Sequence, residues 1–417
     1  MTTGSRQAES CEPDAERVAR AELTRLVEPC DTVASTLVGV AGAVETVRWI
    51  RSGRPAPQEW QRAVVGTLMS EGQAGAGARF AAAASRWRAR ASDVDGARDL
   101  RNAALLGARL VIPGDDEWPS GMADLGSGAP LALWVRGTAH LAGSLTAAVS
   151  IVGARAASAY GVRVAGDISD GLIGRGECIV SGGAYGIDSA AHGAACLTGG
   201  SGERAATVAF LAGGIDRLYP PGNAQVFERV LRDGLIVAEV APGSAPMKSR
   251  FLLRNRLIAA ASRATVVVEA GWRSGALSTA NRAAELMRDV GAVPGSVFSA
   301  TSAGCHRLIR DGVATLVSDV SDVIELAGRM GADLAQPPQS PVADYDNLMP
   351  VDRQVLDALP LRHGAGIEAL TRVAGLGDTE VRSAIARLEL AGLTRRDGAG
   401  WKKAGPMKSA GSEGAAG

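Results

Sequence analysis

Short apolar runs that close in small-residue turns recur through the middle of the chain. Four of them lie at 149–155, 178–188, 207–214 and 265–271, and glycine stands in each closing turn. The runs are rich in β-branched residues and are separated by segments of helical length, which is the pattern of a buried parallel sheet with crossover helices. The pattern therefore predicts an α/β, doubly wound fold.

The turns that close these runs indicate where a ligand should bind. In open parallel sheets the ligand crevice lies beyond the carboxyl ends of the strands, and each turn stands at such an end. Two further apolar runs, 108–113 and 130–137, are expected to extend the sheet at its edge. Helical spacing follows the strands. We expect Asn223 to cap one helix and 274–288 to form another.

The segment ahead of the sheet has helical spacing. We expect a disordered leader over 1–14, a small helical domain over 15–106 and the sheet domain over 107–330. The turn 39–42 separates two short helices and has two interpretations. It grips a DNA backbone, as SAM-like and helix-hairpin-helix units do, or it belongs to a helical domain that only packs. The second interpretation is favoured, because such turns are common in helical proteins.

The chain beyond the sheet predicts a separate small unit. A proline-rich linker over 331–349 leads to three helical segments and a hairpin with an Asp-Gly turn within 350–404. Asp378 is expected to cap the third helix. Three helices and a basic hairpin are typical of a winged-helix domain, and the tail 405–417 is expected to be disordered.

Composition narrows the class of protein without identifying a partner. Lysine plus arginine and aspartate plus glutamate both number 44, so any affinity for nucleic acid must come from local clusters. The five cysteines have no paired spacing, which argues against a zinc site and a disulfide framework. The polar start lacks a signal-peptide core, and no apolar run reaches membrane-spanning length. We therefore expect a cytoplasmic protein that makes no contact with a membrane.

One glycine turn has the composition of an anion site. In Gly182-Gly183-Ala184-Tyr185-Gly186, backbone N–H groups and a following helix start are expected to favour phosphate. Mononucleotides, dinucleotides and nucleic acid all fit such a turn. No Gly-x-Gly-x-x-Gly follows the first strand and no P-loop motif occurs, which disfavours conventional dinucleotide binding and P-loop hydrolysis.

A cluster of four cations and an asparagine stands in 248–256. Cations near phosphate-binding turns suit an extended polyanion. A solvated basic helix face explains the same run equally well, because charge runs usually face solvent. Both interpretations remain open at this point.

Residues suited to catalysis are few. The four histidines do not pair with a cysteine or serine in a nucleophile motif. Asp188 and His192 stand four apart, which fits an acid–base pair or, more commonly, a hydrogen bond that stabilises a helix. The turn from Glu269 into 274–279 is a further candidate for holding a phosphate or a base edge. We predict no catalytic residue, no metal site and no cofactor.

At this point the sheet domain resembles a known family, the DNA-processing protein A family (DprA, also called Smf). Many motifs match in order over the sheet domain, and both flanking domains match its three-part layout more loosely. The winged-helix and N-terminal helical parts carry less specific matches, and one departure is Leu252, where the family usually has proline after Phe251. The matching stretches are 151–155, 158–161, 180–188, 191–192, 214–223, 254–259, 267–270, 274–280, 293–295 and 304–309.

The resemblance implies an extended Rossmann-like sheet and a binding protein rather than an enzyme. Members bind single-stranded DNA and help to load the recombinase RecA in natural transformation, and they form homodimers. With the basic cluster, the family's pocket elements give these expected DNA-binding residues: Gly153, Ala154, Arg155, Ser181, Gly182, Gly183, Ala184, Gly186, Lys248, Arg254, Asn255, Arg256, Ser274 and Gly275. Arg155 and Arg256 are expected to hold the DNA backbone at the rim of the crevice.

Three interpretations remain beside this one. A nucleotide-binding sensor or a nucleotide-hydrolysing Rossmann-like enzyme is the alternative function, although the Pro-Gly-Gly-x-Gly-Thr turn of phosphoribohydrolases is absent. Leu308 and Ile309 either form a dimer interface or pack on their own sheet. The winged-helix unit is either a protein-interaction module or a duplex-DNA binder that uses Arg382, Arg387, Arg395, Arg396, Lys402 and Lys403.

Overall fold

The computed structural model describes residues 14–70, 72, 74–199, 203–328 and 348–404. The chain divides into two compact units between residues 335 and 336. The first holds the helical and sheet parts, and the second holds the C-terminal helices and hairpin. The leader expected over 1–14, the linker over 331–349 and the tail over 405–417 lie outside the described residues, apart from a few residues at their borders.

Six helices form the N-terminal part of the first unit. They pack around a shared core that contains Leu23, Leu37, Ile50 and Trp87. Aspartate side chains cap three of them by accepting backbone N–H groups, as the capping preference predicts. The helices are α1 (Ala15–Leu26), α2 (Thr32–Ala41), α3 (Ala43–Ser52), α4 (Gln58–Ser70), α5 (Ala76–Arg90) and α6 (Gly96–Leu105).

The turn between α2 and α3 contains Gly42, whose φ of +79° permits a sharp change of direction. Among the described helices, none is by itself long and apolar enough to cross a membrane. Helices α2 and α3 pass that test only when they are joined, and a bend of 110° separates them. Both contribute side chains to the core of the helical part.

A nine-stranded sheet forms the centre of the first unit, in the order β1-β2-β6-β5-β4-β3-β7-β8-β9. Strands β3 to β9 run parallel, and β1 and β2 add antiparallel pairs at one edge, as predicted for 108–113 and 130–137. The strands are β1 (Ala108–Val111), β2 (Leu133–Arg136), β3 (Ala148–Val152), β4 (Cys178–Ser181), β5 (Thr207–Leu211), β6 (Leu235–Ala238), β7 (Ala264–Val267), β8 (Asp289–Ala292) and β9 (Thr315–Leu316).

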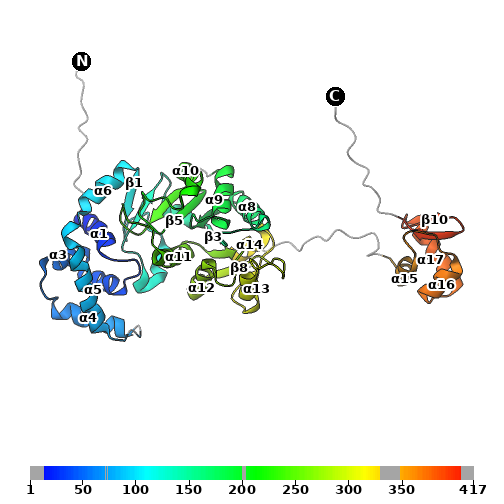
Figure 1. Cartoon of the computed structure of the whole chain (residues 1–417), viewed down its shortest axis with the longest axis horizontal. Helices are drawn as coiled ribbons and strands as arrows, with labels where there is room; N and C mark the ends of the chain where they lie inside the picture. Colours follow the sequence, from blue (N-terminus) through cyan, green and yellow to red (C-terminus); the bar gives the residue numbers. More distant parts are fainter. Residues whose placement is uncertain (1–13, 71, 73, 200–202, 329–347, 405–417) are drawn as a thin grey trace, which may run out of the picture. The chain divides into compact units, whose positions relative to one another are not determined.

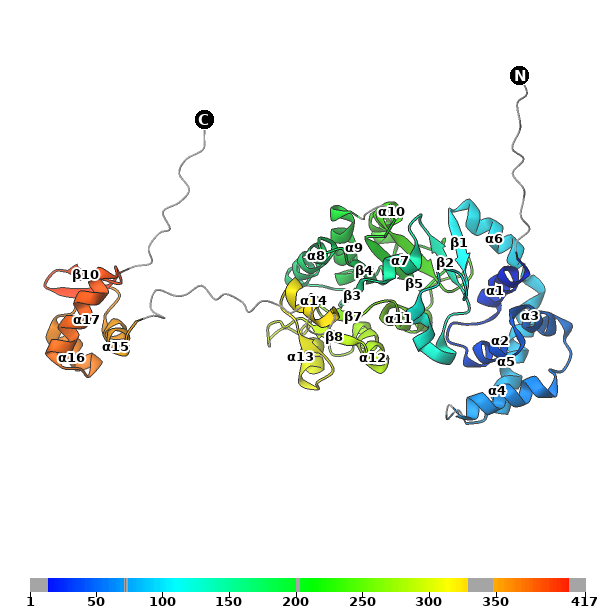
Figure 2. The ribbon, with the colours of Figure 1, turned by 180° about the vertical axis from the view of Figure 1, so that it is seen from behind.

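Helices cover both faces of the sheet, so the predicted α/β, doubly wound class is confirmed (Figures 1 and 2). One layer comprises α8 (Ala159–Ile173), α9 (Ile187–Thr198), α10 (Ala224–Asp233) and α14 (Val320–Ala327). The other comprises α7 (Leu141–Leu145), α11 (Lys248–Ala260), α12 (Gly275–Glu285) and α13 (Ala303–Arg310). Alternate side chains of β3 belong to the cores on the two faces of the sheet. Val149 and Ile151 face the first layer of helices, and Val152 faces the second.

The strand order reverses at β3. Successive strands run from β3 to β6 on one side, and α11 then carries the chain back to β7, on the other side of β3. Loops that leave the carboxyl ends of β3 and β7 therefore diverge, which opens a crevice between them. This topological switch point positions the candidate site.

The second unit is a three-helix domain with a two-stranded wing. It comprises α15 (Pro350–Ala358), α16 (Ile367–Ala374), α17 (Asp378–Leu390), β10 (Thr394–Asp397) and β11 (Gly400–Lys403). Apolar side chains of all three helices form its core, and Gly398 makes the predicted turn with φ of +64°. The expected cap at Asp378 is wrong by one residue. Gly377 is the N-cap, and the Glu380 carboxylate accepts its N–H at 2.9 Å.

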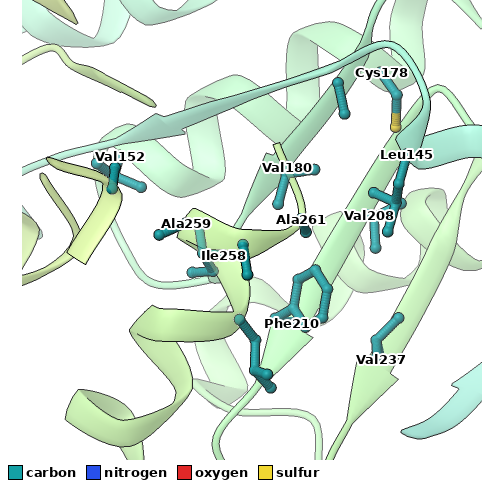
Figure 3. Close-up of a cluster of buried hydrophobic side chains, with 14 of the residues drawn as sticks. Leu145, Val152, Cys178, Val180, Val208, Phe210, Val237, Ile258, Ala259 and Ala261 are labelled. Atoms are coloured by element: carbon teal, nitrogen blue, oxygen red, sulfur yellow. The ribbon is translucent and has the colours of Figure 1, made fainter. Parts of the chain in front are cut away.

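The packing between the sheet and α11 can be tested by a substitution at Phe210. Its ring is fully buried in the core shown in Figure 3, among Val208, Val237 and Ile258. Phe210→Ala should destabilise the first unit by about 3–5 kcal/mol through lost burial and a cavity. The matched control is Leu105→Ala at the end of α6, where the side chain is 86% exposed. It should change stability by less than about 0.5 kcal/mol. Denaturant unfolding measures both, and equal effects would contradict the packing described.

Candidate functional site

A pocket of about 590 Å³ opens at the switch point, between the carboxyl ends of β3 and β7. Its walls come from segments far apart in sequence. The lining residues lie in the turn 152–156 after β3, at Ala184 and Asp188 after β4, between 251 and 258 in α11, at Gly271, 273–276 and Thr279 around the start of α12, and at Thr301. The carboxyl edge of the sheet was the predicted location of the site, and the structure brings the predicted turns together there.

The turn after β3 presents Arg155 to the pocket. The Ala154 carbonyl accepts the Ile187 N–H at 3.2 Å, while the Ala154 N–H donates to the Glu269 carbonyl at 2.7 Å. A Cβ on Gly186 would lie 2.2 Å from the Ala154 oxygen, and φ at Gly186 is +76°. Glycine is therefore required where the start of α9 meets this turn. Arg155 is exposed, and its guanidinium lies 5.1 Å from the centroid of the Phe251 ring.

The glycine turn after β4 is closed by its own side-chain partners. The Asp188 carboxylate accepts the N–H groups of Gly182 at 3.2 Å and Ala184 at 3.3 Å. The expectation that these two amides are free to bind a phosphate is therefore wrong. Burial raises the pKa of Asp188, and the charge of Arg254 opposes that shift.

Asn223 holds the same turn from the other side. Its Nδ2 donates to the carbonyls of Gly183 and Ala184, both at 3.0 Å. Asn223 occupies the N-cap position of α10, but its side chain makes no capping bond, which corrects the predicted role. Ser181, also expected at the site, is buried, and its hydroxyl donates to the Ile151 carbonyl. These contacts make the turn a rigid wall rather than an anion cradle.

Most cations of the basic cluster in α11 bond to other residues of the chain. Arg250 forms a two-pronged pair with Glu28 of the helical part, at 2.9 and 3.0 Å. Arg256 forms a similar pair with Glu239, at 2.9 and 2.6 Å. Lys248, at the start of the helix, is exposed. The sequence left two interpretations of this cluster, polyanion binding and a solvated helix face. The structure shows a third role, because most of these cations form contacts that hold the fold together.

Arg256 lies away from the pocket. Its side chain is 4% exposed, and besides the Glu239 pair its Nε donates to the Gly128 carbonyl at 2.8 Å. The expectation that Arg256 lies at the rim of the crevice and holds a phosphate is wrong. The partner that neutralises it stands 17 residues earlier in the chain, and the motif itself does not contain that partner.

Arg254 braces the floor of the pocket. Its Nη1 donates to the Gly182 carbonyl at 2.8 Å and also to the Phe210 carbonyl. A Cβ on Gly182 would lie 2.5 Å from this guanidinium, so the absent side chain makes room for the cation. Burial lowers the pKa of Arg254 to about 10, and Arg155 acts in the same direction. The group stays charged at neutral pH and adds positive potential beneath the pocket.

The start of α12 forms another wall of the pocket. The Ser274 hydroxyl accepts the Ala276 N–H at 3.2 Å, and Asn255 Nδ2 donates to the Gly275 carbonyl at 3.3 Å. A Cβ on Gly275 would meet no atom within 4 Å, so this end of the helix opens into the pocket. A helix N-terminus carries partial positive charge and attracts anions.

Sequence reasoning missed one residue of this wall. Arg273 lines the pocket and is exposed. It follows the glycine turn after β7, just as Arg155 follows the glycine turn after β3, so the signal that singled out Arg155 was present at 271–273 as well. In the described part of the chain, neither arginine is paired with a carboxylate.

Glu269 ties together the loops around the pocket. Its buried carboxylate accepts the Ser158 N–H at 2.9 Å, the Ser158 hydroxyl at 2.6 Å and the Thr301 hydroxyl at 3.0 Å. From the sequence, the turn after Glu269 was expected to be able to bind a phosphate or the edge of a base. The carboxylate itself serves neither purpose, because its oxygens already accept bonds from α8 and from the segment ahead of α13.

A family model described as DNA recombination-mediator protein A matches residues 109–328. This range includes β1 to α14 and every wall of the pocket. The chain belongs to the DNA recombination-mediator protein A family. The resemblance stated from the motifs is thereby confirmed.

Relatives within this family agree with the assignment. A Mycobacterium tuberculosis protein described as a DNA processing protein DprA is 42% identical over 391 residues, which cover 91% of this chain and 92% of that protein. DNA processing protein DprA of Streptococcus pneumoniae is 40% identical over 210 residues, which cover 50% of this chain and 71% of that protein. The X-ray structure of DprA from the same species matches with a TM-score of 0.55 and 28% identity, over 75% of this chain and 98% of that chain.

The acid–base candidates of this family member have separate structural roles. Asp188 bonds the turn amides described above, whereas His192 Nδ1 lies 2.7 Å from the Thr207 hydroxyl. Burial lowers the pKa of His192 to about 3, so the ring is neutral at physiological pH. The helical spacing of four suggested that Asp188 and His192 bond to each other, but each of them bonds to other groups.

Leu308 and Ile309, which the sequence offered as a dimer interface, lie on α13 and face the core of their own subunit. Leu308 is buried in the core beside Cys305, and Ile309 packs against the same core. The interpretation that these two side chains pack on their own sheet is therefore favoured, and Leu308 is not available to a partner.

The cations of the winged-helix unit are largely neutralised within that unit. Four of the six form ion pairs, and Arg396 lies over the Trp401 ring at 5.1 Å. The pairs are Arg382–Asp378, Arg387–Asp352, Lys402–Asp397 and Lys403–Asp357. Binding of duplex DNA by this unit stays a prediction, and the pairs reduce the charge available for it.

The structural role of Arg256 is testable by its effect on stability. Arg256→Ala leaves the Glu239 carboxylate, whose side chain is 11% exposed, without its cation. Removing one partner of a buried pair costs about 3–5 kcal/mol. Arg155→Ala removes an exposed side chain and should cost less than about 0.5 kcal/mol. Chemical denaturation of both variants distinguishes them, and an Arg256→Ala protein as stable as the parent would overturn the structural role.

Proposed function

We propose that the pocket binds single-stranded DNA, with backbone phosphates held between Arg155 and Arg273. The observation that carries this proposal is the contrast among the arginines. The inner guanidiniums of Arg254 and Arg256 are buried and bonded to internal partners, whereas Arg155 and Arg273 are exposed and line the pocket. The start of α12 directly follows Arg273 and adds backbone N–H groups to the pocket. A row of positive sites around an open groove suits a chain of phosphates better than a single anion.

Phe251 favours a single strand over a duplex. Its ring lines the pocket and meets the Tyr219 ring edge-on, with centroids 5.8 Å apart. Arg155 lies on the same ring, so a base that stacks here would bring its phosphate close to a cation. Bases are free to stack on a protein side chain only when they are not paired in a duplex.

The pocket favours binding over catalysis. Among the described residues that line it, Asp188 is the one carboxylate, and two backbone amides already occupy it. A nucleotide-hydrolysing enzyme needs a general base within reach of the reacting atoms. The alternative of a nucleotide-hydrolysing Rossmann-like enzyme is therefore disfavoured. A nucleotide sensor remains the outcome to test against.

The phosphate contacts are tested by oligo-dT binding across a salt series. Arg155→Ala and Arg273→Ala should each weaken binding by about 1–3 kcal/mol, as expected for a charge-assisted hydrogen bond. Each should also flatten the dependence of log K on log salt by about 0.7. The loss should be the same for other base sequences, because phosphates carry no sequence information.

Arg232→Ala is the matched control. Arg232 is an exposed arginine at the end of α10, paired with Asp233, and its loss should change neither affinity nor salt slope. Two folded pocket variants with the parent's affinity and slope would overturn the site. Competition by thymidine monophosphate as strong as that by oligo-dT would support the sensor instead.

We also propose that the chain delivers the bound strand to the recombinase RecA, as a homodimer in the cytoplasm. The description of the family as a recombination mediator supports the first part. A reduced compartment suits Cys30, Cys178, Cys196 and Cys305, which are all free thiols. Capture of RecA on the immobilised protein should increase when single-stranded DNA is present, and capture that is absent under both conditions would contradict delivery.

We propose that self-association uses the edge strand β9, because Leu308 is buried in the core. An edge strand offers unpaired backbone groups to a second strand, and Leu316 on it is exposed. Light scattering should give a dimer at tens of micromolar, the scale of a weak dimer. Leu316→Glu should shift the mass toward the monomer, because two buried carboxylates would face each other. A parent protein that is monomeric throughout this range would contradict the assignment.

A further inference from the structure

Exposed aromatic side chains gather at one edge of the sheet. Among the described residues, the exposed aromatic side chains are those of Tyr160, Tyr185, Tyr219, Trp272 and Phe298. Each of them follows the carboxyl end of a parallel strand, which is the edge that carries the pocket. Soluble proteins bury such rings where they can, so their concentration at one edge indicates a ligand.

None of the five rings lines the pocket, and three of them follow β3, β7 and β8. Phe298 is 96% exposed and Trp272 is 55% exposed. Tyr160, at the start of α8, donates its hydroxyl to the Pro294 carbonyl at 2.7 Å. This bond holds Tyr160 in place, and the exposure of Trp272 and Phe298 leaves these two rings accessible to a ligand.

The loops that carry Trp272 and Phe298 are bonded into one surface. The Ala270 N–H donates to the Thr301 carbonyl and the Gly304 N–H donates to the Ala270 carbonyl, both at 2.7 Å. Thr301 itself lines the pocket. The surface is thus continuous with the pocket rim.

Cations accompany the rings. The Arg307 guanidinium lies 5.3 Å from the centroid of the Trp272 ring, and Arg273 is the next residue in the chain after Trp272. Arg307 also pairs with Asp311, so part of its charge is neutralised. Exposed rings next to cations match the two parts of a single strand, which are bases and phosphates.

We propose that Trp272 and Phe298 form a second base-stacking platform, which extends the single-stranded DNA site from the pocket across the carboxyl ends of β7 and β8. The proposal rests on the proposed function, because it requires that the pocket holds a single strand. It adds that nucleotides beyond those in the pocket bind by stacking. A longer strand therefore gains affinity that a short one lacks.

The length dependence of oligo-dT binding tests the platform separately from the pocket. Phe298→Ala and Trp272→Ala should weaken a long oligo-dT by roughly 5- to 150-fold each, the range expected for one lost stacked base. They should leave the affinity of the shortest oligo-dT that the parent still binds unchanged. Arg155→Ala should weaken both lengths. Phe298→Tyr should restore long-strand affinity, because it keeps a ring for stacking.

Leu197→Ser at the end of α9 is the control, because it removes an exposed apolar side chain at the opposite end of the strands. It should affect neither length, and circular dichroism should show that all variants are folded. An oligo-dT with abasic sites in the part beyond the pocket should already have lost the contribution of Phe298, so Phe298→Ala should weaken it no further.

The outcomes separate the platform from the pocket. Platform variants with the parent's affinity for long strands would overturn the platform, while the proposed function would stand if Arg155→Ala still weakens binding. If the same variants instead changed only the mass measured by light scattering, the surface would be an interface between copies of the chain, and the platform would again be overturned. Failure of Arg155→Ala to weaken either length would count against the pocket.

Discussion

The shape of the pocket depends on the buried carboxylate of Glu269, which joins the loops around it. Loops that leave a sheet at a switch point diverge, and nothing in the strand ladder itself fixes their separation. Glu269 fixes it by accepting bonds from Ser158 ahead of α8 and from Thr301 ahead of α13. A buried charge with several donors holds such loops firmly, because breaking the network leaves polar groups unsatisfied. The pocket is therefore preformed, and a ligand need not order its walls.

Two populations of arginine surround this preformed pocket. One population is buried or half-buried and bonds to partners within the chain: Arg250 to Glu28, Arg256 to Glu239, and Arg254 to the carbonyl groups of Gly182 and Phe210. The other, Arg155 and Arg273, stands exposed at the ends of strands. The buried members hold α11 against the sheet and the helical part. Removing a buried cation and removing an exposed one thus have different consequences, although both lower the net charge by one.

Much of the fold followed from the sequence, because glycine turns after β-branched runs report on the ends of parallel strands. That signal located the pocket and Arg155, and the family motifs confirmed the architecture. Which cations remain free did not follow. Arg250 and its partner Glu28 are 222 residues apart, so no local pattern contains the pair. Leu308 likewise has a helical spacing that fits an interface and a core equally well, and only its burial distinguishes the two.

The contact between Gly182 and Arg254 has a consequence for substitutions at these two positions. The guanidinium occupies the space that a side chain at position 182 would need, with 2.5 Å left to a Cβ. A larger residue at 182 requires the arginine to move or to be shortened, and either change disturbs the bonds that Arg254 donates to the Phe210 and Gly182 carbonyls. The effects of substitutions at 182 and 254 should therefore be non-additive, because the two side chains would compete for the same space.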